Sequence, residues 1–299
     1  MQLSKLLLDY VKEEVFNLPF KTHELIKKYP DLKINNPQIE KSASWNSIFQ
    51  WHKFGYNAEA YNSNNPNIIN GWKHENNIYR SCHLEINELK NFAIKKEEKN
   101  WACDIQQVEC LCSSKSDLTR YKTIDDFALN MPNNFAKEIS FQSLLKNLSH
   151  NEIRILKKDS SDFFESYAWD KRIILINSGG SHHFAAARLI AKKLKQEVTL
   201  TGTHYKYNIN INNFKSLLRK FNIFILPDDA EFKKFFWEAM KSFKATFYKT
   251  FLPRPYEHSF VIMLPKWEKR SQKISVILNQ NNAFSFNTYV EHNLIPFCD

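Results

Sequence analysis

Hydrophobic positions in the second half of the chain predict a strand, a helix and a second strand in succession. Residues 172–177 form a short apolar run, rich in β-branched side chains and flanked by polar ones, which is typical of a buried strand. Residues 184–194 place Ala185, Ala186, Leu189 and Ile190 at helical spacing. Residues 198–203 return as a strand, so the pattern predicts a strand–turn–helix–strand unit.

The same periodicities predict further elements along the chain. Helices are expected at residues 1–11, 22–28, 44–53, 141–148, 213–221 and 228–248. Strands are expected at residues 107–111, 152–156, 223–226, 260–264, 274–278 and 283–289. The fold class that follows is α/β, with α+β as the alternative. We expect a helical or irregular N-terminal region over residues 1–120 and an α/β domain over residues 121–299.

Composition adds a basic balance to this picture. The chain has 299 residues, a formal net charge of +10 and a pI near 9.2. Such a charge suits nucleotides or nucleic acid as partners, and it equally suits a lysine-rich surface without a partner. An aromatic content of 14% argues against a disordered chain.

No hydrophobic run approaches the length of about 18 residues that a membrane span needs. The first residues do not resemble a signal peptide, and five cysteines at irregular spacing do not form a disulfide framework. We therefore expect a cytoplasmic protein without a membrane partner, although export without a cleaved signal stays open.

The predicted turn carries the chemistry. The chain contains only five glycines, and two of them are adjacent at Gly179 and Gly180, between the strand and the helix. Free N–H groups at a helix N-terminus suit an oxyanion. Ser181 can cap the helix or donate to a phosphate oxygen, and His182 or His183 can bind the anion or transfer a proton. The alternative is a purely structural glycine turn with a serine cap, because the spacing matches neither common phosphate-loop motif.

The run Ile-Asn-Ser-Gly-Gly-Ser-His-His-Phe-Ala-Ala-Ala-Arg at residues 176–188 resembles the signature of the ParB/sulfiredoxin-like superfamily. The resemblance covers residues 145–205. In that superfamily a strand ends in a glycine-containing motif that opens an alanine-rich helix and binds nucleotide phosphates. Ser181 stands where sulfiredoxin has cysteine, so sulfinic-acid repair is not expected. His183 stands where an arginine is usual, and Arg188 is a candidate replacement.

The resemblance implies a nucleotide site for ATP, ADP or CTP, with Mg²⁺ as a possible cofactor. Its binding residues would be Asn177, Ser178, Gly179, Gly180, Ser181 and Arg188. Its catalytic candidates would be Ser181, His182 and His183. The function expected from the sequence is phosphotransfer or nucleotide hydrolysis. The alternatives are a DNA-binding or nucleolytic protein and a non-enzymatic protein whose aromatic N-terminal half binds a protein partner.

Other polar clusters leave two interpretations each. Asp159, Asp162 and Glu165 either hold Mg²⁺ or act as a base, or belong to a solvated loop. The segment 204–207, His-Tyr-Lys-Tyr, either stacks a base or ends a strand. The aromatic cluster around Trp45, Trp51 and Phe54 forms either core or a partner surface. The cysteine spacing does not favour zinc, and no metal ligands are predicted.

Overall fold

The computed structural model describes residues 11–30, 32, 40–55, 67–132, 135–157, 159–254 and 260–293. The chain divides into two compact units that are interleaved in sequence. The first contains residues 1–38, 50–92 and 209–299, and the second contains residues 39–49 and 93–208. Both units combine segments from before and after residue 120, because their sheets pair strands that are distant in sequence. The division expected at residue 120 therefore differs from the observed one.

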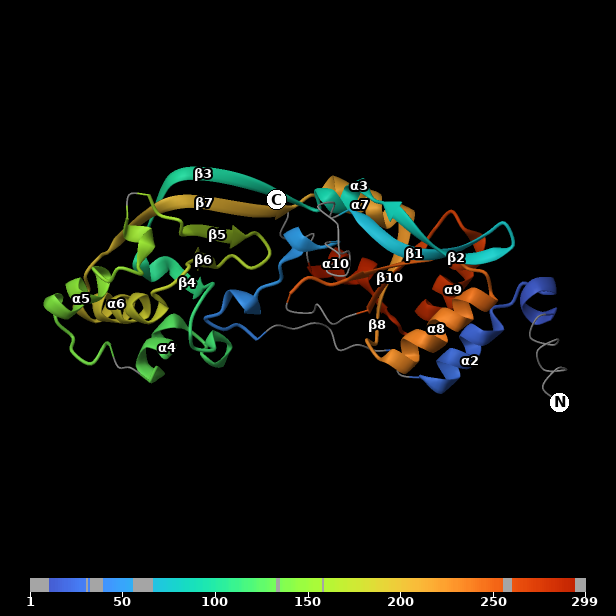
Figure 1. The fold of residues 1–299 in the computed structure, drawn as a ribbon, viewed down its shortest axis with the longest axis horizontal. Coiled ribbons are helices and arrows are strands. Elements are labelled where there is room, and N and C mark those ends of the chain that lie inside the picture. The colour runs from blue at the N-terminus through green and yellow to red at the C-terminus, as the bar shows by residue number, and fades with distance from the viewer. Residues whose placement is uncertain are drawn as a thin grey trace. The chain divides into compact units, whose positions relative to one another are not determined.

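The first unit is built on an antiparallel sheet with strand order β11-β8-β10-β9-β1-β2 (Figure 1). Its strands are β1 (Ile68–Glu75), β2 (Ile78–Glu85), β8 (Phe221–Leu226), β9 (Phe247–Phe251), β10 (Phe260–Pro265) and β11 (Phe284–Ser285). Its helices are α2 (Phe20–Lys28), α3 (Asn87–Lys90), α7 (Ile211–Lys220), α8 (Ala230–Ser242), α9 (Lys269–Gln280) and α10 (Phe286–Asn293). A π-helical turn, η1 (Val11–Val15), and a 3-10 turn, η3 (Trp51–Lys53), complete it.

The second unit contains a mixed sheet with strand order β3-β7-β5-β6-β4. Its strands are β3 (Ala93–Asp104), β4 (Val108–Leu111), β5 (Phe163–Tyr167), β6 (Ile173–Ile176) and β7 (Thr199–Ile209). β4 runs parallel to β6, β5 runs parallel to β7, and β5 and β6 are antiparallel. Helices α4 (Ile124–Asn130) and α5 (Phe141–Leu148) pack against α6 (Ser181–Leu194) (Figure 1). The 3-10 turns are η2 (Trp45–Ser47), η4 (Ile105–Gln107), η5 (Leu118–Arg120) and η6 (Arg154–Leu156).

The central strand–turn–helix–strand unit is confirmed as β6, α6 and β7. Helix α6 is covered on its apolar side, where Ala185, Ala186, Leu189 and Ile190 join the core of the second unit. The helix expected at residues 141–148 and the strands at 107–111, 223–226 and 260–264 are also present. The mixed α/β or α+β fold class is confirmed.

Several expected elements are wrong in type. Residues 274–278 were expected as a strand because Ile274, Val276 and Leu278 alternate, but they lie in α9. Two N–H groups at the start of α9 donate to the side chain of Glu268, which caps the helix. Ile274, Ile277 and Leu278 are then buried at helical spacing, and Val276 is 53% exposed. Residues 283–289 are mainly the start of α10, and residues 152–156 form the turn η6 rather than a strand.

The helix expected at residues 228–248 begins as predicted, with Asp229 as its cap, but ends at Ser242. Lys244 has a left-handed backbone (φ 52°), and the N–H of Ala245 donates to the carbonyl of Met240 at 2.9 Å. This arrangement ends a helix. The chain then reverses and enters β9.

The N-terminal region is not largely helical, since β1 and β2 form a hairpin and β3 and β4 follow. Asn76 and Asn77, with φ angles of 52° and 60°, connect β1 to β2. Two left-handed residues in a two-residue loop give the turn type that matches strand twist. The helix expected at residues 44–53 is also absent, and this segment contains two short 3-10 turns instead. The chain passes from the second unit to the first within the same segment.

The aromatic cluster is core rather than surface. Trp51 and Phe54 are almost fully buried in the first unit, and the indole N–H of Trp45 donates to the Tyr167 hydroxyl at 2.8 Å in the second.

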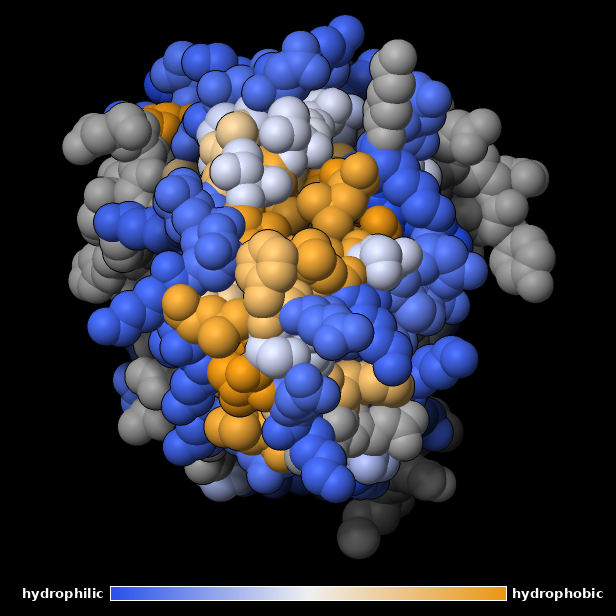
Figure 2. All heavy atoms as spheres, turned by 90° about the vertical axis from the view of Figure 1, so that its left-hand side faces the viewer, coloured by the Kyte–Doolittle hydropathy of each residue, from blue (hydrophilic) through white to orange (hydrophobic). Residues whose placement is uncertain are grey.

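Exposed apolar side chains lie instead on and beside α4 and α5, where they include Leu129, Ile139, Phe141 and Leu145. Figure 2 shows apolar side chains gathered on this side of the second unit. The described helices include none that is both long and apolar enough to cross a membrane. The helix expected at residues 1–11 lies almost entirely outside the described residues.

Candidate functional site

Asn177 fixes the loop that follows β6. It is 5% exposed, and its side-chain oxygen accepts the N–H groups of Cys112 and Ser113 at 3.0 and 3.1 Å. Its amide nitrogen donates to the carbonyls of Ser113 and Gly179, both at 2.9 Å. These bonds use the full hydrogen-bonding capacity of the amide. Asn177 therefore positions the loop rather than contacting a ligand.

Ser178 is held by a buried carboxylate. Its N–H and hydroxyl both donate to Oδ1 of Asp162, at 3.1 and 2.8 Å, and the guanidinium of Arg154 donates to its hydroxyl. Asp162 is 4% exposed, so this pairing is shielded from water. Of the three carboxylates considered in the sequence, Asp162 supports the loop. Glu165 instead accepts from the Tyr167 hydroxyl on the other face of the sheet, and Asp159 is exposed.

Gly180 is the residue from which α6 begins. Its backbone is left-handed (φ 71°), and a Cβ there would lie 2.7 Å from the backbone oxygen of Glu152. Gly180 therefore has to be glycine. A Cβ on Gly179 would lie 3.5 Å from the Glu152 side chain, which is ordinary contact. The expected cap at Ser181 is not observed, since Gly180 is the capping residue and the Ser181 hydroxyl donates to the Ser114 hydroxyl at 2.8 Å.

Glu152 lies against the loop, and its carboxylate occupies the Gly180 N–H, which a bound anion would also use. The N–H of Gly180 donates to Oε2 of Glu152 at 3.2 Å. An N–H at the start of a helix is a position where a phosphate oxygen would bind. The site therefore already holds one internal anion.

His182 and His183 project from the first turn of α6 into separate contacts. Nε2 of His182 lies 3.0 Å from the Ser116 hydroxyl. Nδ1 of His183 lies 2.9 Å from the side-chain oxygen of Asn147, an acceptor, so Nδ1 carries the proton and Nε2 of a neutral ring is basic. The His183 ring also stacks on His150, with centroids 3.7 Å apart.

Partial burial lowers the pKa of both His182 and His183. Nearby positive charge has the same effect, from Lys115 on the pKa of His182 and from His150 on that of His183. Glu152 raises the pKa of both rings but does not reverse the direction. Both imidazoles are therefore mainly neutral near pH 7 and able to accept a proton.

The loop, the segment after β4 and the segment before η6 enclose a cavity of about 500 Å³. Because β4 and β6 are parallel neighbours, the segments that follow them meet at one edge of the sheet. The lining residues are Ser113, Ser114, Lys115, Phe135, His150, Glu152, Ser178, Gly179, Gly180, Ser181, His182 and His183. We call this space the loop pocket. The sequence patterns did not predict that Lys115, His150 and Glu152 belong to the site. Lys115 reaches it because β4, which precedes Lys115, pairs in parallel with β6.

Arg188 lies away from the loop pocket. Its guanidinium pairs with Asp125 and donates to the carbonyl of Gln106 at 3.0 Å, and Lys192 binds the same carboxylate at 2.7 Å. Burial favours a higher pKa for Asp125, but the hydrogen bonds and charges of Lys192 and Arg188 outweigh it and lower that pKa. The structure therefore does not place Arg188 where it could replace an arginine at position 183.

The remaining candidates are structural or lie elsewhere. His204 is 3% exposed, lies 2.8 Å from the Ser166 hydroxyl, and has its pKa lowered to about 4 by burial and by Lys206. Tyr205 lines a different cavity. Burial raises the pKa of Cys103 and of Cys110 to about 12. Within the described ranges, no group of three or more His, Cys, Asp or Glu side chains is arranged to hold a metal ion.

Comparison with known proteins gives one match. A family model described as a family of unknown function (DUF6685) matches residues 98–294. The chain belongs to DUF6685. The matched region spans the loop pocket, most of the second unit and the C-terminal segment of the first, so the pocket belongs to the part of the chain that defines the family. No curated protein and no solved structure matches the chain. The resemblance to the ParB/sulfiredoxin-like superfamily and the cytoplasmic location stay predictions.

Proposed function

We propose that this DUF6685 protein binds a nucleotide through its phosphates in the loop pocket and transfers or hydrolyses a phosphoryl group. The observation that carries the proposal is the meeting of the α6 N-terminus, Lys115 and two neutral histidines in one cavity of about 500 Å³. Helix N–H groups and a lysine stabilise phosphate charge. Neutral imidazoles accept protons.

The residues take the following roles in this proposal. The first-turn N–H groups of α6 and the ammonium of Lys115 bind phosphate oxygens. Nε2 of His183 accepts the proton of the attacking hydroxyl or water, while its Nδ1–H stays bonded to Asn147. The new oxygen–phosphorus bond forms as the bond to the leaving oxygen breaks.

Mg²⁺ fits this site in a limited way. Glu152 is the carboxylate of the pocket lining, and Mg²⁺ commonly binds through one or two carboxylates together with substrate phosphates. Bound there, the ion would neutralise phosphate charge. Glu152 would then have to leave the Gly180 N–H.

Thermal unfolding with ATP, ADP or CTP, with and without Mg²⁺, tests the proposal. A ligand at about 100 times its Kd adds about 2.7 kcal/mol to the free energy of unfolding, enough to raise Tm by several degrees. Lys115→Glu should abolish the shift. Lys193→Glu is the matched control, because Lys193 is exposed on α6 and does not line the pocket.

Phosphate release from the nucleotide that binds measures the reaction. His183→Ala should remove turnover while leaving a measurable Tm shift, because the helix N-terminus and Lys115 remain. If no nucleotide raises the Tm of the unmodified protein, nucleotide binding is refuted. Binding without turnover would leave a nucleotide-binding protein and refute the enzymatic part.

A further inference from the structure

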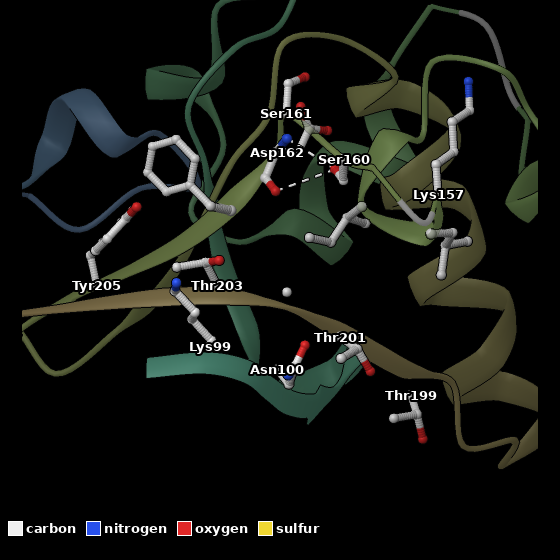
Figure 3. Close-up of a pocket in the computed structure, with 14 residues that line it drawn as sticks. Lys99, Asn100, Lys157, Ser160, Ser161, Asp162, Thr199, Thr201, Thr203 and Tyr205 are labelled. Carbon is white, nitrogen blue, oxygen red and sulfur yellow. Dashed lines mark hydrogen bonds between the residues drawn. The ribbon is translucent and has the colours of Figure 1, made fainter. Parts of the chain in front are cut away.

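A second cavity lies in the same unit, with a volume of about 780 Å³. Figure 3 shows it between strand β7 on one side and the segment that leads into β5 on the other. The lining residues are Lys99, Asn100, Ile155, Leu156, Lys157, Ser160, Ser161, Asp162, Phe163, Thr199, Thr201, Gly202, Thr203 and Tyr205. We call it the strand groove. Its lining shares no residue with that of the loop pocket.

The strand alternation of β7 builds one wall of the groove. Thr199, Thr201, Thr203 and Tyr205 share one face of β7, because alternate residues of a strand point to the same side. Gly202 alternates with these residues and also borders the groove, and a Cβ on it would lie 2.9 Å from Cδ1 of Ile155, another lining residue. The glycine therefore lets turn η6 pack closely against the strand.

An irregularity in β3 brings a cation to the groove. Asn100 has a left-handed backbone (φ 53°), which interrupts the alternation of the strand, and Lys99 and Asn100 both line the groove although they are adjacent. The Lys99 side chain is 78% exposed and lies 3.8 Å from Glu97. A contact at that distance and exposure leaves its charge available to a ligand. The ammonium of Lys157, by contrast, already donates to the carbonyl of Asn151 at 2.6 Å.

Aromatic rings close one end of the groove. Phe163 and Tyr205 meet edge to face with centroids 5.2 Å apart. The ammonium of Lys95 lies 4.4 Å from the centre of the Tyr205 ring. The carboxylate in the lining, Asp162, has its Oδ1 engaged by Ser178, and its backbone N–H is bound to Ser160 (Figure 3).

We propose that the strand groove binds single-stranded nucleic acid. A base would stack on the Phe163 and Tyr205 rings, and phosphates would lie against Lys99 in the groove and against Lys95, which lies outside the lining but beside the Tyr205 ring. Threonine and serine hydroxyls would complete the contacts to sugar and phosphate oxygens. Interleaved aromatic and basic side chains along an open groove bind single strands without reading sequence. Exposed lysines beside the rings favour this polyanion over a neutral oligosaccharide. The inference does not depend on the proposed nucleotide reaction.

Fluorescence anisotropy with a labelled oligothymidylate of about 12 nucleotides tests the proposal. The unmodified protein should bind with an affinity that falls as salt rises. Lys99→Glu should weaken binding about tenfold and reduce the slope of log K against log salt by about 0.7. Lys96→Glu is the matched control, because Lys96 is exposed on the same strand and does not line the groove.

Three further variants separate stacking from charge. Tyr205→Leu should weaken binding about tenfold, while Tyr205→Phe keeps the ring and should bind like the unmodified protein. Thr201→Glu, at an exposed position, places a negative charge inside the groove without disturbing the core, and it should weaken binding of the oligonucleotide. The proposal is overturned if the oligonucleotide does not bind at low salt, or if Lys96→Glu weakens binding as much as Lys99→Glu. Tighter binding of a duplex, or displacement of the oligonucleotide by a neutral oligosaccharide, would also overturn it.

Discussion

Replacement of Glu152 by glutamine tests whether the loop pocket is an anion site. The Glu152 carboxylate accepts the Gly180 N–H at 3.2 Å, and it lies against Gly179. A phosphate that binds the start of α6 has to displace this carboxylate or share the site with it. Glutamine keeps the shape and an accepting oxygen but removes the negative charge. Glu152→Gln should therefore bind inorganic phosphate more tightly in the absence of Mg²⁺.

The expected gain follows from the repulsion that is removed. Two like unit charges about 4 Å apart repel by about 1 kcal/mol in bulk water and by about 4 kcal/mol near a protein surface. Glu152 is half-buried, and it can rotate away from a bound anion, so the lower part of this range applies. A gain of about 1–2 kcal/mol corresponds to a Kd about 5- to 30-fold lower.

Titration calorimetry with inorganic phosphate and then with ADP, in buffer containing a chelator, measures this gain. Raising the salt concentration should reduce the difference between the two proteins, because screening weakens charge repulsion. Glu197→Gln is the matched control, since Glu197 is exposed and lies outside the loop pocket. It should leave the phosphate affinity unchanged.

In the presence of Mg²⁺, Glu152→Gln should have the opposite effect on the affinity for the nucleotide. If Glu152 holds the ion beside the phosphates, Glu152→Gln weakens binding of the nucleotide when Mg²⁺ is present. Phosphate binding that is equal or weaker in Glu152→Gln without Mg²⁺, with Tm unchanged, would refute the internal-anion argument. If Glu197→Gln tightened phosphate binding as much as Glu152→Gln does, the gain would come from the net charge of the protein and not from the position of Glu152.

Three further outcomes are expected. Gly180→Ala should lower the free energy of unfolding by about 1–3 kcal/mol, because of its left-handed backbone and the close Glu152 oxygen, whereas Gly179→Ala should cost less than about 0.5 kcal/mol; chemical denaturation measures both. Asp125 has a lowered pKa in the folded state, so its ion pairs stabilise the protein above the unfolded-state pKa of about 3.9 and this stability is lost as pH falls through the folded pKa. Asp125→Asn should therefore cost about 1–3 kcal/mol at pH 7, and the difference should disappear in acid, as denaturation at a series of pH values would show. In NMR titration His183 should titrate below the usual value of about 6.5, and lower still in Glu152→Gln, which removes a charge that raises its pKa.

Local pattern was sufficient for the elements that carry their own signals. Helix α5 has its cap at Ser140, and β6 is a short β-branched run, so each could be placed from a few neighbouring residues. The hairpin between β1 and β2 was also within reach, because Asn76 and Asn77 are a turn signal between two runs of strand residues. Strand β3 could not be predicted from local pattern, because its residues are mostly exposed and charged and its place in the sheet depends on pairing with β7.

The candidate site divides in the same way. The glycine turn at the start of α6 follows from the sequence, because Gly180 adopts a conformation that other residues rarely adopt. Lys115 and Glu152 come to it through the parallel pairing of β4 with β6 and through the turn η6. The expected strand at residues 152–156 hid this contact, because a strand would have carried Glu152 into a sheet rather than against the loop.

The contacts of the loop decide how its pocket can respond to a ligand. Four hydrogen bonds hold the side chain of Asn177, two more join Ser178 to Asp162, and Gly180 is packed against the backbone of Glu152. A loop held in this way does not have to reorganise when an anion binds, which removes one cost of binding. The side chain of Glu152 makes a single bond to the loop and can rotate without disturbing those contacts. The affinity of the loop pocket for an anion should therefore depend on the position and charge of Glu152 more than on any rearrangement of the loop.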